Sequence, residues 1–524
     1  MTRQDPPGWV ADAVFYQVFP DRFARSERVM RPGPFEPWDS PPTLSGFKGG
    51  DLLGVAEHLD HIGGLGATAI YLNPVFQSAS NHRYHTYDYL AVDPLLGGDA
   101  ALRELLDAAH ERGMRVILDG VFNHTGRGHW AFHHVLEAGA ASPYRRWFRF
   151  DEEALDAGVP IDAYPAAHDR ARLRRGRRRS GGRSGADVAG GSLQRVGYQA
   201  WWDLPALPKL NTDEPAVREH LFEVAEHWLR FGADGWRLDV PAEIDDPSFW
   251  AEFRERCLAV NPEAYLVGEI WQVAPAWLAG DRFDALMNYP LAKATLGFVG
   301  GASLDRPLLR RHDQYAQIEP LAGAAYAARL SELLGAYRPA VVEAQLNLLD
   351  SHDTPRLASI LGGDTALIRL ALLLQATLPG APCLYYGGEV GLPGGIDPDC
   401  RRAFPWDEAR WDRDLLAFVR GAFATRHAEP LLRRGELEVL ATADRAIAFE
   451  RRAPDEPAPS LVVAVNAGTA PVTLDVGGPV QSEPGPEAFA LPGLAPPSLE
   501  VGSDGRLRIG LGPRSGTIVR ARAI

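Results

Sequence analysis

Eight short apolar runs, separated by amphipathic segments, constrain the fold of this 524-residue chain more than any other feature. Strand-like runs that alternate with helices are typical of βα units, whose strands pair in parallel. Eight such units predict a (β/α)8 TIM barrel of the α/β class. The predicted strands are residues 13–18, 67–72, 114–118, 235–239, 264–268, 285–289, 344–349 and 381–386.

Two parts of the chain depart from this alternation. Far more residues lie between His124 and the run at 235 than one βα unit needs, which predicts an excursion subdomain on the third βα loop. Beyond residue 427, short alternating runs between Gly- and Pro-rich turns predict a C-terminal antiparallel β-sandwich. We therefore divide the chain into the first part of the barrel (1–124), the excursion (125–205), the second part of the barrel (206–426) and the β-domain (427–524).

Residues 168–185 of the excursion (HDRARLRRGRRRSGGRSG) are rich in Arg, Gly and Ser and contain almost no apolar side chain. Such a segment has little to bury, so we expect a mobile surface loop. A nucleic-acid or localisation patch is the functional alternative. The formal net charge of −14 disfavours a nucleic-acid or anionic-membrane partner for the whole chain and favours the solvated insertion.

The apolar runs of the chain also indicate where in the cell the protein is expected. The N-terminal residues contain no uninterrupted apolar stretch of the secretory type, and polar residues, Pro or Gly break every later apolar run. We therefore expect a soluble, cytoplasmic protein with no membrane partner. The three cysteines, Cys257, Cys383 and Cys400, have no CxxC spacing, so neither a disulfide framework nor a zinc site is indicated.

Acidic residues stand at the carboxyl ends of four predicted strands, and these ends of a barrel open on one mouth. We therefore expect Asp119, Asp239, Glu269 and Asp353 to converge. Arg237 lies two residues before Asp239 and projects to the same side of a strand, so its guanidinium should hold the pKa of Asp239 low and keep this carboxylate ionised. A structural ion pair is the alternative interpretation.

Convergent carboxylates with His124, His352 and Arg237 suit either a divalent metal centre or glycoside hydrolysis. The metal hypothesis ranks second because the chain has no HxH or HExxH spacing. Glycoside hydrolysis also accounts for the aromatic residues near the strand ends, since sugar rings stack on aromatic side chains. These residues are Tyr71, Phe76, Tyr84, Tyr87, Trp201, Trp202, Trp271 and Tyr289.

Four short segments, in order along the chain, resemble the motif regions of the alpha-amylase family of glycoside hydrolases. Two further stretches are similar to markers of the neopullulanase, cyclomaltodextrinase and maltogenic amylase group. The resemblance extends from about residue 13 to the end of the chain. The family motifs are residues 119–124 (DGVFNH), 235–239 (GWRLD), 268–271 (GEIW) and 349–354 (LDSHDT), and the group markers are residues 207–211 (LPKLN) and 81–84 (NHRY).

This resemblance implies retaining cleavage of α-1,4 and also α-1,6 glucosidic bonds in maltooligosaccharides, cyclodextrins or pullulan, with small substrates cleaved faster than starch. It makes Asp239 the nucleophile, Glu269 the general acid and then base, and Asp353 a stabiliser of the distorted sugar. Glu269 has no charged neighbour in the sequence, which favours its protonated form. The implied substrate-binding residues are Tyr84, Asp88, His124, Arg237, Trp271, His352 and Arg401.

Two alternatives use the same scaffold, a transglycosylase or isomerase and a catalytically inactive sugar-binding relative. The presence of all three carboxylates argues against the inactive relative. The chain also departs from the group. It starts almost directly at the first strand, where the group usually has an N-terminal domain, so the dimer built on that domain is not expected. Residues 24–28 (ARSER) replace an Asn/Asp-rich calcium loop, of which only Gly50 and Asp51 remain. We expect no cofactor and no metal, with calcium as the open alternative.

Overall fold

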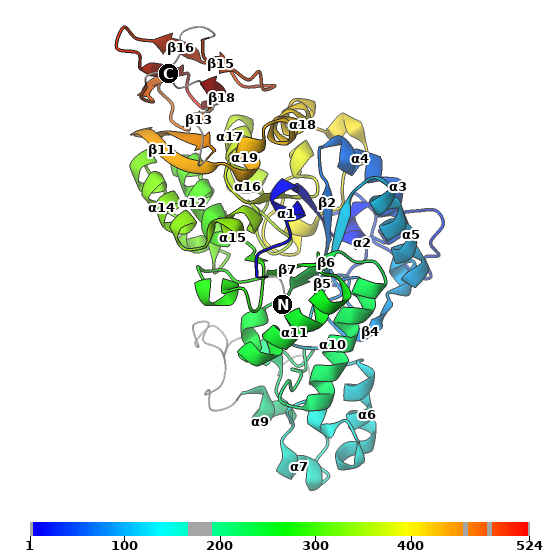
Figure 1. Cartoon of the computed structure of the whole chain (residues 1–524). Coiled ribbons are helices and arrows are strands. Elements are labelled where there is room, and N and C mark those ends of the chain that lie inside the picture. Colours follow the sequence, from blue (N-terminus) through cyan, green and yellow to red (C-terminus); the bar gives the residue numbers. More distant parts are fainter. Residues whose placement is uncertain (1–3, 166–190, 454–459, 479–484, 522–524) are drawn as a thin grey trace.

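The computed structural model describes residues 4–165, 191–453, 460–478 and 485–521 (Figure 1). The whole of the Arg-rich segment at 168–185 lies outside the described residues, and so does the expectation about its mobility. Within these ranges, no helix has the length and apolar character needed to cross a membrane.

Eight parallel strands form the predicted barrel, in the order β8-β7-β6-β5-β2-β1-β10-β9. The two edge strands meet through a parallel bridge between Met287 and Leu346, and the Asn288 amide donates to the Leu346 carbonyl at 2.8 Å, which closes the ring. Each predicted run overlaps one barrel strand, so the barrel prediction is confirmed. The strands are β1 (Phe15–Val18), β2 (Ala69–Leu72), β5 (Arg115–Gly120), β6 (Gly235–Leu238), β7 (Tyr265–Gly268), β8 (Ala285–Leu286), β9 (Leu346–Asn347) and β10 (Ala381–Tyr385).

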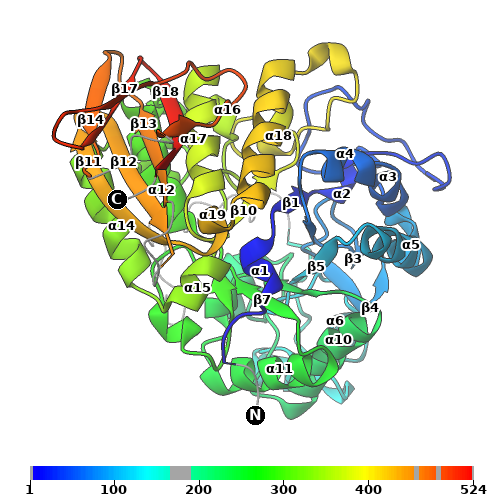
Figure 2. The same ribbon diagram turned by 45° about the horizontal axis from the view of Figure 1, so that its top comes forward.

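Helices surround the barrel (Figure 2). Local sequence signals explain where several of them begin: Pro215 opens α10 at its first position, and the Asp364 carboxylate caps α17 by accepting from the Ala366 and Leu367 amides. The larger helices of the barrel are α3 (Leu52–Glu57), α4 (Leu59–Gly64), α5 (Gly98–Glu111), α10 (Pro215–Arg230), α11 (Pro247–Val260), α12 (Tyr289–Gly300), α14 (Gly323–Gly335), α15 (Pro339–Ala344), α17 (Thr365–Thr377) and α18 (Arg413–Ala428). Short helices are α1 (Trp9–Asp12), α2 (Pro20–Phe23), α13 (Arg306–Leu309), α16 (Leu357–Ile360) and α19 (Pro430–Arg434).

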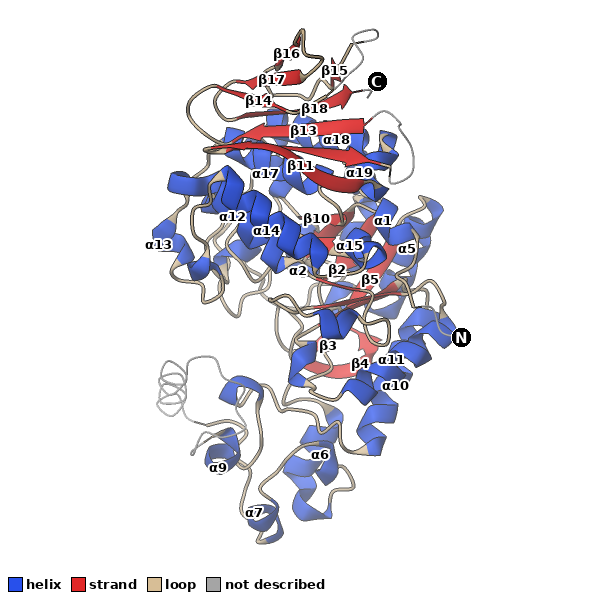
Figure 3. Ribbon diagram, turned by 60° about the vertical axis from the view of Figure 1, so that its left-hand side comes forward, coloured by secondary structure: helices blue, strands red, loops and turns tan. Residues whose placement is uncertain are grey.

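The long connection after β5 forms the predicted excursion, which lies at the end of the molecule opposite the C-terminal sheets (Figure 3). Its described helices are α6 (Trp130–Ala138), α7 (Glu152–Asp156) and α9 (Ser192–Val196). A small aromatic core holds it together, in which the Phe132 ring lies 5.0 Å from Phe148 and 4.9 Å from Tyr198. Isolated bridges, such as that of Phe148 with Leu210, tie this subdomain to the second part of the barrel.

Two antiparallel sheets follow the barrel, as the sequence predicts. One has the order β11-β12-β13-β18-β15 and the other β14-β17-β16, and a separate apolar core that includes Leu474, Ile509 and Val519 joins them. The opposite face of the larger sheet packs on α14 and α17. The strands are β11 (Glu436–Ala443), β12 (Ala446–Arg452), β13 (Ser460–Asn466), β14 (Val472–Asp475), β15 (Glu487–Ala488), β16 (Ser498–Val501), β17 (Leu507–Leu511) and β18 (Ser515–Ala521).

A hairpin that the sequence did not predict lies between β2 and β5. It consists of β3 (Phe76–Ser78) and β4 (Thr86–Val92). Its turn carries Tyr84 over the carboxyl ends of the barrel strands, where the Tyr84 hydroxyl lies 2.8 Å from Asp119 Oδ2.

Candidate active site

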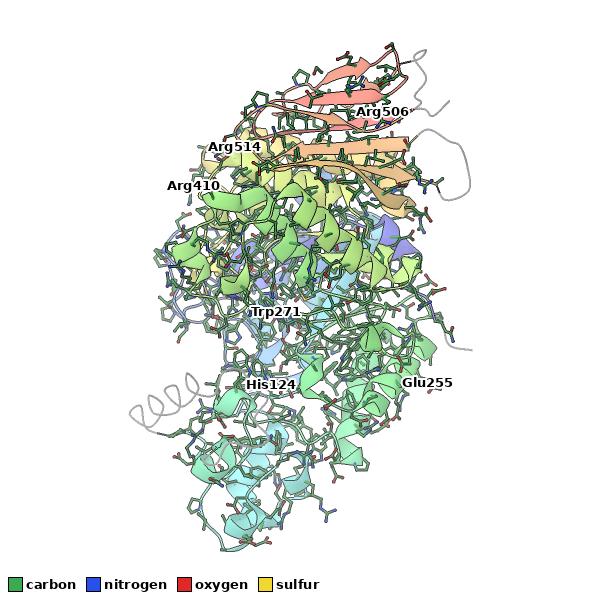
Figure 4. All side chains as sticks on the ribbon, turned by 90° about the vertical axis from the view of Figure 1, so that its left-hand side faces the viewer. His124, Glu255, Trp271, Arg410, Arg506 and Arg514 are labelled. Atoms are coloured by element: carbon green, nitrogen blue, oxygen red, sulfur yellow. The ribbon has the colours of Figure 1, made fainter. Side chains whose placement is uncertain are left out.

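The predicted convergence of acidic residues is present at the carboxyl ends of the barrel strands. Asp119 belongs to β5, Asp239 follows β6 and Glu269 follows β7. The loop after β9 supplies Asp353. Figure 4 shows this part of the molecule between the C-terminal sheets and the excursion, with Trp271 and His124 labelled.

A buried guanidinium occupies the centre of the site. Arg237 Nη1 lies 2.8 Å from Asp119 Oδ1 and 3.0 Å from Asp239 Oδ1, and Nη2 lies 2.9 Å from Glu269 Oε2. Arg237 is therefore shared among three carboxylates, one of which is its predicted partner Asp239. Isolated burial of this many charges would be costly, so the pairing with Arg237 is what allows the cluster to exist.

The shared cation also changes the expected charge states. Burial raises the pKa of both Asp239 and Glu269, and Arg237 opposes this rise at both residues. The prediction of a low pKa for Asp239 was therefore wrong, because one guanidinium near three buried carboxylates does not offset their desolvation and mutual repulsion. Two neighbouring carboxyl groups in this position favour holding a proton between them.

Glu269 is held by donors on both oxygens. The Val240 amide donates to Oε2 at 3.1 Å and the Trp271 indole Nε1 donates to Oε1 at 3.2 Å. Val240 has φ 35° and ψ 50°, a left-handed conformation that is strained for a β-branched residue. Asp239 Oδ2, by contrast, is buried and has no hydrogen-bond partner in the described part of the chain.

Asp353 is paired with other groups. His352 Nε2 lies 3.0 Å from its Oδ2, and Arg401 Nη2 lies 3.1 Å from its Oδ1. Burial alone would raise the pKa of Asp353, but His352 and Arg401 lower it below its ordinary value. Arg401 also donates to the His352 carbonyl at 2.8 Å and pairs with Asp397 at 3.1 Å, which fixes the position of the guanidinium. Asp353 is thus ionised, while the pKa values of the nearby Asp239 and Glu269 are raised.

Tyr84 connects the two halves of the site. Its hydroxyl lies 2.8 Å from Asp119 Oδ2 and 2.6 Å from His352 Nε2, and its ring is parallel to the His352 ring at 5.5 Å between centroids. Tyr71 places a second hydroxyl 2.8 Å from the same oxygen of Asp119. These hydrogen bonds link the Arg237 cluster to the Asp353 cluster.

Aromatic rings line both sides of the cluster. His124 is buried and its ring lies parallel to Trp201 at 4.7 Å, and Trp201 stacks on Trp202 at 4.5 Å. Burial lowers the pKa of His124 to about 3, so this ring is neutral. On the other side, the half-buried Trp271 stacks on Tyr289 at 3.5 Å. Such flat apolar surfaces beside carboxylates fit a sugar ring.

Asp88 is the one predicted site residue that lies elsewhere. It belongs to β4, its Oδ1 accepts from the Leu90 amide at 2.8 Å, and its charge acts on His220 of α10. The structure does not bring it into contact with the carboxylates described above. Tyr84, His124, Arg237, Trp271, His352 and Arg401 do lie in the cluster or directly beside it.

Sequence reasoning missed several residues that complete the site. Gln17 of β1 and Asn73 after β2 lie behind His352, His312 donates to the Asp353 carbonyl at 2.9 Å, and Asp397 pairs with Arg401. Gln17 and Asn73 stand at the strand ends just as the carboxylates do. The same strand-end rule, applied to amides as well as acids, would have found them.

The oxygens of the first loop, where calcium was the open alternative, are already paired with a side chain of the protein. Arg31 Nη2 lies 2.7 Å from the Ser26 carbonyl and 2.9 Å from Asp51 Oδ2, and its Nε lies 3.0 Å from the Gly49 carbonyl. The residues here do not fit a calcium ion, because the guanidinium takes the contacts that the ion would need.

A second test concerns Asn123, whose Oδ1 is buried with no hydrogen-bond partner in the described chain. One amide oxygen is far short of the six to eight oxygens that calcium takes. Among the residues that the structure describes, no group of three or more His, Cys, Asp or Glu side chains is placed to hold a metal ion.

Comparisons with known proteins give a consistent result. A model of the alpha amylase catalytic domain matches residues 17–414. A cyclomaltodextrinase of Geobacillus thermopakistaniensis is 41% identical over 440 residues, which is 84% of this chain and 66% of that protein, so the chain spans about two thirds of the length of that relative.

Solved structures match over nearly the whole length. A protein of Thermus thermophilus is 47% identical with a TM-score of 0.83, covering 98% of this chain and 100% of that one. The debranching enzyme of Nostoc punctiforme is 43% identical with a TM-score of 0.82, covering 99% of this chain and 100% of that one.

Proposed function

This chain belongs to the alpha-amylase family of glycoside hydrolases, and on that premise we propose that it is a retaining hydrolase of α-glucosidic bonds. The observation that carries the proposal is the arrangement around Arg237, which pairs with three carboxylates while Asp239 Oδ2 stays unpaired among the described residues. An oxygen with free lone pairs beside a fixed cation suits a nucleophile.

In the first step, Asp239 Oδ2 attacks the anomeric carbon while Glu269 gives its proton to the leaving glycosidic oxygen. Burial raises the pKa of Glu269, which supports this role because the group then holds its proton to a higher pH than a free glutamic acid does. In the second step, Glu269 takes a proton from water, which attacks the same carbon and releases Asp239. Two displacements at one carbon retain its configuration.

Asp353 and Arg401 take a different part in this proposal. Asp353 is ionised by its contacts with His352 and Arg401, so it stays an acceptor for sugar hydroxyls throughout the reaction. Its fixed negative charge also favours the positive charge that develops on the ring in an oxocarbenium-like transition state. Tyr84 and His124 would lie beside the same sugar.

For substrates we propose maltooligosaccharides and cyclodextrins, with cleavage of α-1,6 bonds in pullulan. The relatives named cyclomaltodextrinase and debranching enzyme support both bond types. The stacked rings of Trp201 and Trp202 support a preference for small substrates over starch, since bulky side chains donated by the excursion narrow the approach to the carboxylates.

Two further proposals concern calcium and the location of the protein in the cell. We propose that the first loop works without calcium, supported by the Arg31 contacts described above. We also propose a cytoplasmic location, supported by three buried cysteines that are all free, as is usual in a reducing compartment.

The test of the reaction type is product analysis over time with maltotriose, β-cyclodextrin and pullulan. Proton NMR of the first products reports the anomeric configuration before mutarotation. We expect α-anomers and hydrolysis of all three substrates. First products of β configuration would overturn the retaining mechanism, and products longer than the substrate would instead indicate a transglycosylase.

A further inference from the structure

Two buried amide side chains lie directly behind His352 and make no contact that the mechanism above uses. Gln17 Nε2 is 2.9 Å from His352 Nδ1 and 3.1 Å from Asn73 Oδ1. Asn73 Nδ2 is 3.2 Å from the Tyr84 hydroxyl. All of these amide groups are shielded from water, so each hydrogen atom must be matched to an acceptor within the network.

The proton count starts at Asp119. Its Oδ2 is 2.8 Å from both the Tyr71 and the Tyr84 hydroxyl, and an ionised carboxylate only accepts. Each tyrosine has one hydroxyl hydrogen, so both hydrogens point at Asp119. The Tyr84 oxygen can then only accept from its other neighbours, which means that His352 Nε2, at 2.6 Å, carries a hydrogen.

The same reasoning fixes the orientation of the Asn73 and Gln17 amide groups. Because the Tyr84 oxygen accepts, Asn73 turns Nδ2 toward it and Oδ1 toward Gln17. Gln17 must then present Nε2, since its own oxygen in that place would face the Asn73 oxygen. The second hydrogen of Gln17 Nε2 points at His352 Nδ1, which must therefore be without a hydrogen.

We infer that Gln17 and Asn73 are positioning residues that hold His352 as the neutral tautomer, with a hydrogen on Nε2 and none on Nδ1. Nε2 is the ring nitrogen that faces Asp353 Oδ2, at 3.0 Å. The single Nε2 hydrogen of His352 is thereby shared between the Tyr84 oxygen and Asp353 Oδ2, and Arg401 is the residue that supplies the positive charge.

Charged groups on every side are compatible with this assignment. Asp353 faces the ring from the site, while Arg401 reaches Asp353 and the His352 backbone carbonyl. Asp119 and Arg237 act through Tyr84, whose ring is parallel to that of His352, and Glu269 and His82 interact electrostatically with the imidazole. The Phe19 ring lies 6.5 Å from the imidazole. Without Gln17, no donor would reserve Nδ1 as an acceptor, and the hydrogen of the ring would be free to move to that nitrogen. Nε2 would then no longer donate to Asp353.

The direct test is neutron diffraction from deuterium-exchanged crystals of the full chain near neutral pD. We expect nuclear density for deuterium on His352 Nε2 and none on Nδ1, with the deuterated amide nitrogen of Gln17 facing Nδ1. Deuterium on Nδ1, or the Gln17 oxygen facing it, would overturn the inference. This outcome is independent of the proposed function, since it needs no substrate.

A kinetic test separates positioning from simple packing. Gln17→Leu should lower kcat on maltotriose by about tenfold with little change in KM, since a misplaced donor affects the transition state more than binding. Gln375→Leu is the matched control, because Gln375 is another buried amide whose Nε2 donates to two carbonyls, those of Asn347 and Cys383, and it does not touch His352.

Both variants should lose similar thermal stability. If kcat falls equally in Gln17→Leu and Gln375→Leu, the role of Gln17 is only structural and the inference fails. If neither variant nor the parent protein cleaves maltotriose, the proposed function fails while the neutron result still decides the tautomer.

Discussion

Asp119→Asn separates the electrostatic role of Asp119 from its packing. Asp119 accepts three hydrogen bonds at 2.8 Å, from Arg237 on Oδ1 and from Tyr71 and Tyr84 on Oδ2. Asparagine keeps one oxygen, which the two tyrosines occupy. Its NH2 group then faces Arg237, so a donor meets a donor. The substitution therefore removes one charge-assisted hydrogen bond and one negative charge without creating a cavity.

The magnitudes follow from this geometry. A hydrogen bond to a charged group contributes about 1.5–3 kcal/mol, so we expect about 2 kcal/mol less stability. Asp119 and Asp239 both contact Arg237 Nη1, so the contacting oxygens lie within about 6 Å of each other. At an effective dielectric constant of about 20, two charges at this separation repel by about 3 kcal/mol, or about two pKa units.

Removal of the Asp119 charge should therefore lower the pKa of Asp239, whose pKa the charge of Asp119 raises. The nucleophile must be ionised, so the acidic limb of kcat/KM should move to lower pH, by about one unit or more. The variant would thus be less stable and less active, yet would keep its remaining activity at more acidic pH.

The assays are urea unfolding and a pH profile of kcat/KM on maltotriose. Asp284→Asn is the matched control, since the buried Asp284 pairs with Arg254 at 2.9 Å and directly precedes β8, away from the carboxyl ends of the strands. This control should lose stability without moving the acidic limb. An acidic limb that stays in place or moves to higher pH in Asp119→Asn would refute the electrostatic reasoning.

Three other predictions follow from the same contacts. Asp239→Asn and Glu269→Gln should each lower kcat on maltotriose by at least about a hundredfold while the protein stays folded, since each removes a step that no neighbour replaces. Activity within about tenfold of the parent in either variant would contradict these roles. EDTA should leave the melting temperature of the parent protein unchanged. Arg31→Met should lower the melting temperature, because the Ser26 and Asp51 oxygens lose their partner. A melting temperature that falls with EDTA would reveal a bound metal. Trp202→Ala should raise KM for maltoheptaose more than for maltotriose. Trp202 is 53% exposed and stacks on Trp201, which in turn stacks on His124. Equal changes in KM for the two substrates would show that Trp202 does not contact longer chains.

The barrel was predictable because its strands are buried on both faces. Such strands appear as short continuous apolar runs, and the runs at 67–72 and 381–386 each contain a fully buried strand. The strand ends then locate the acids without any knowledge of side-chain packing, since all eight ends open on one mouth. This is why Asp239 and Glu269, although they follow different strands, could be placed in one site from the sequence.

Contacts within the site could not be predicted in the same way. That Arg237 is shared with Glu269 depends on a rotamer chosen by packing among β5, β6 and β7, and sequence adjacency shows only the neighbour at position 239. The surroundings of Asp88 could not be predicted either. A motif match gives its position along the chain, whereas in β4 its carboxylate accepts from the Leu90 amide and its charge acts on His220 of α10.

The central claim is that Asp239 forms a covalent bond to the sugar, and mass spectrometry tests it most directly. The Glu269→Gln variant with α-maltosyl fluoride should accumulate the intermediate, because fluoride leaves without an acid while water lacks its general base. We predict a mass increase of one maltosyl unit on the peptide that contains Asp239, absent in the double variant that also carries Asp239→Asn. An adduct on another residue, or consumption of the fluoride with the double variant at the same rate, would contradict the assignment of Asp239 as the nucleophile.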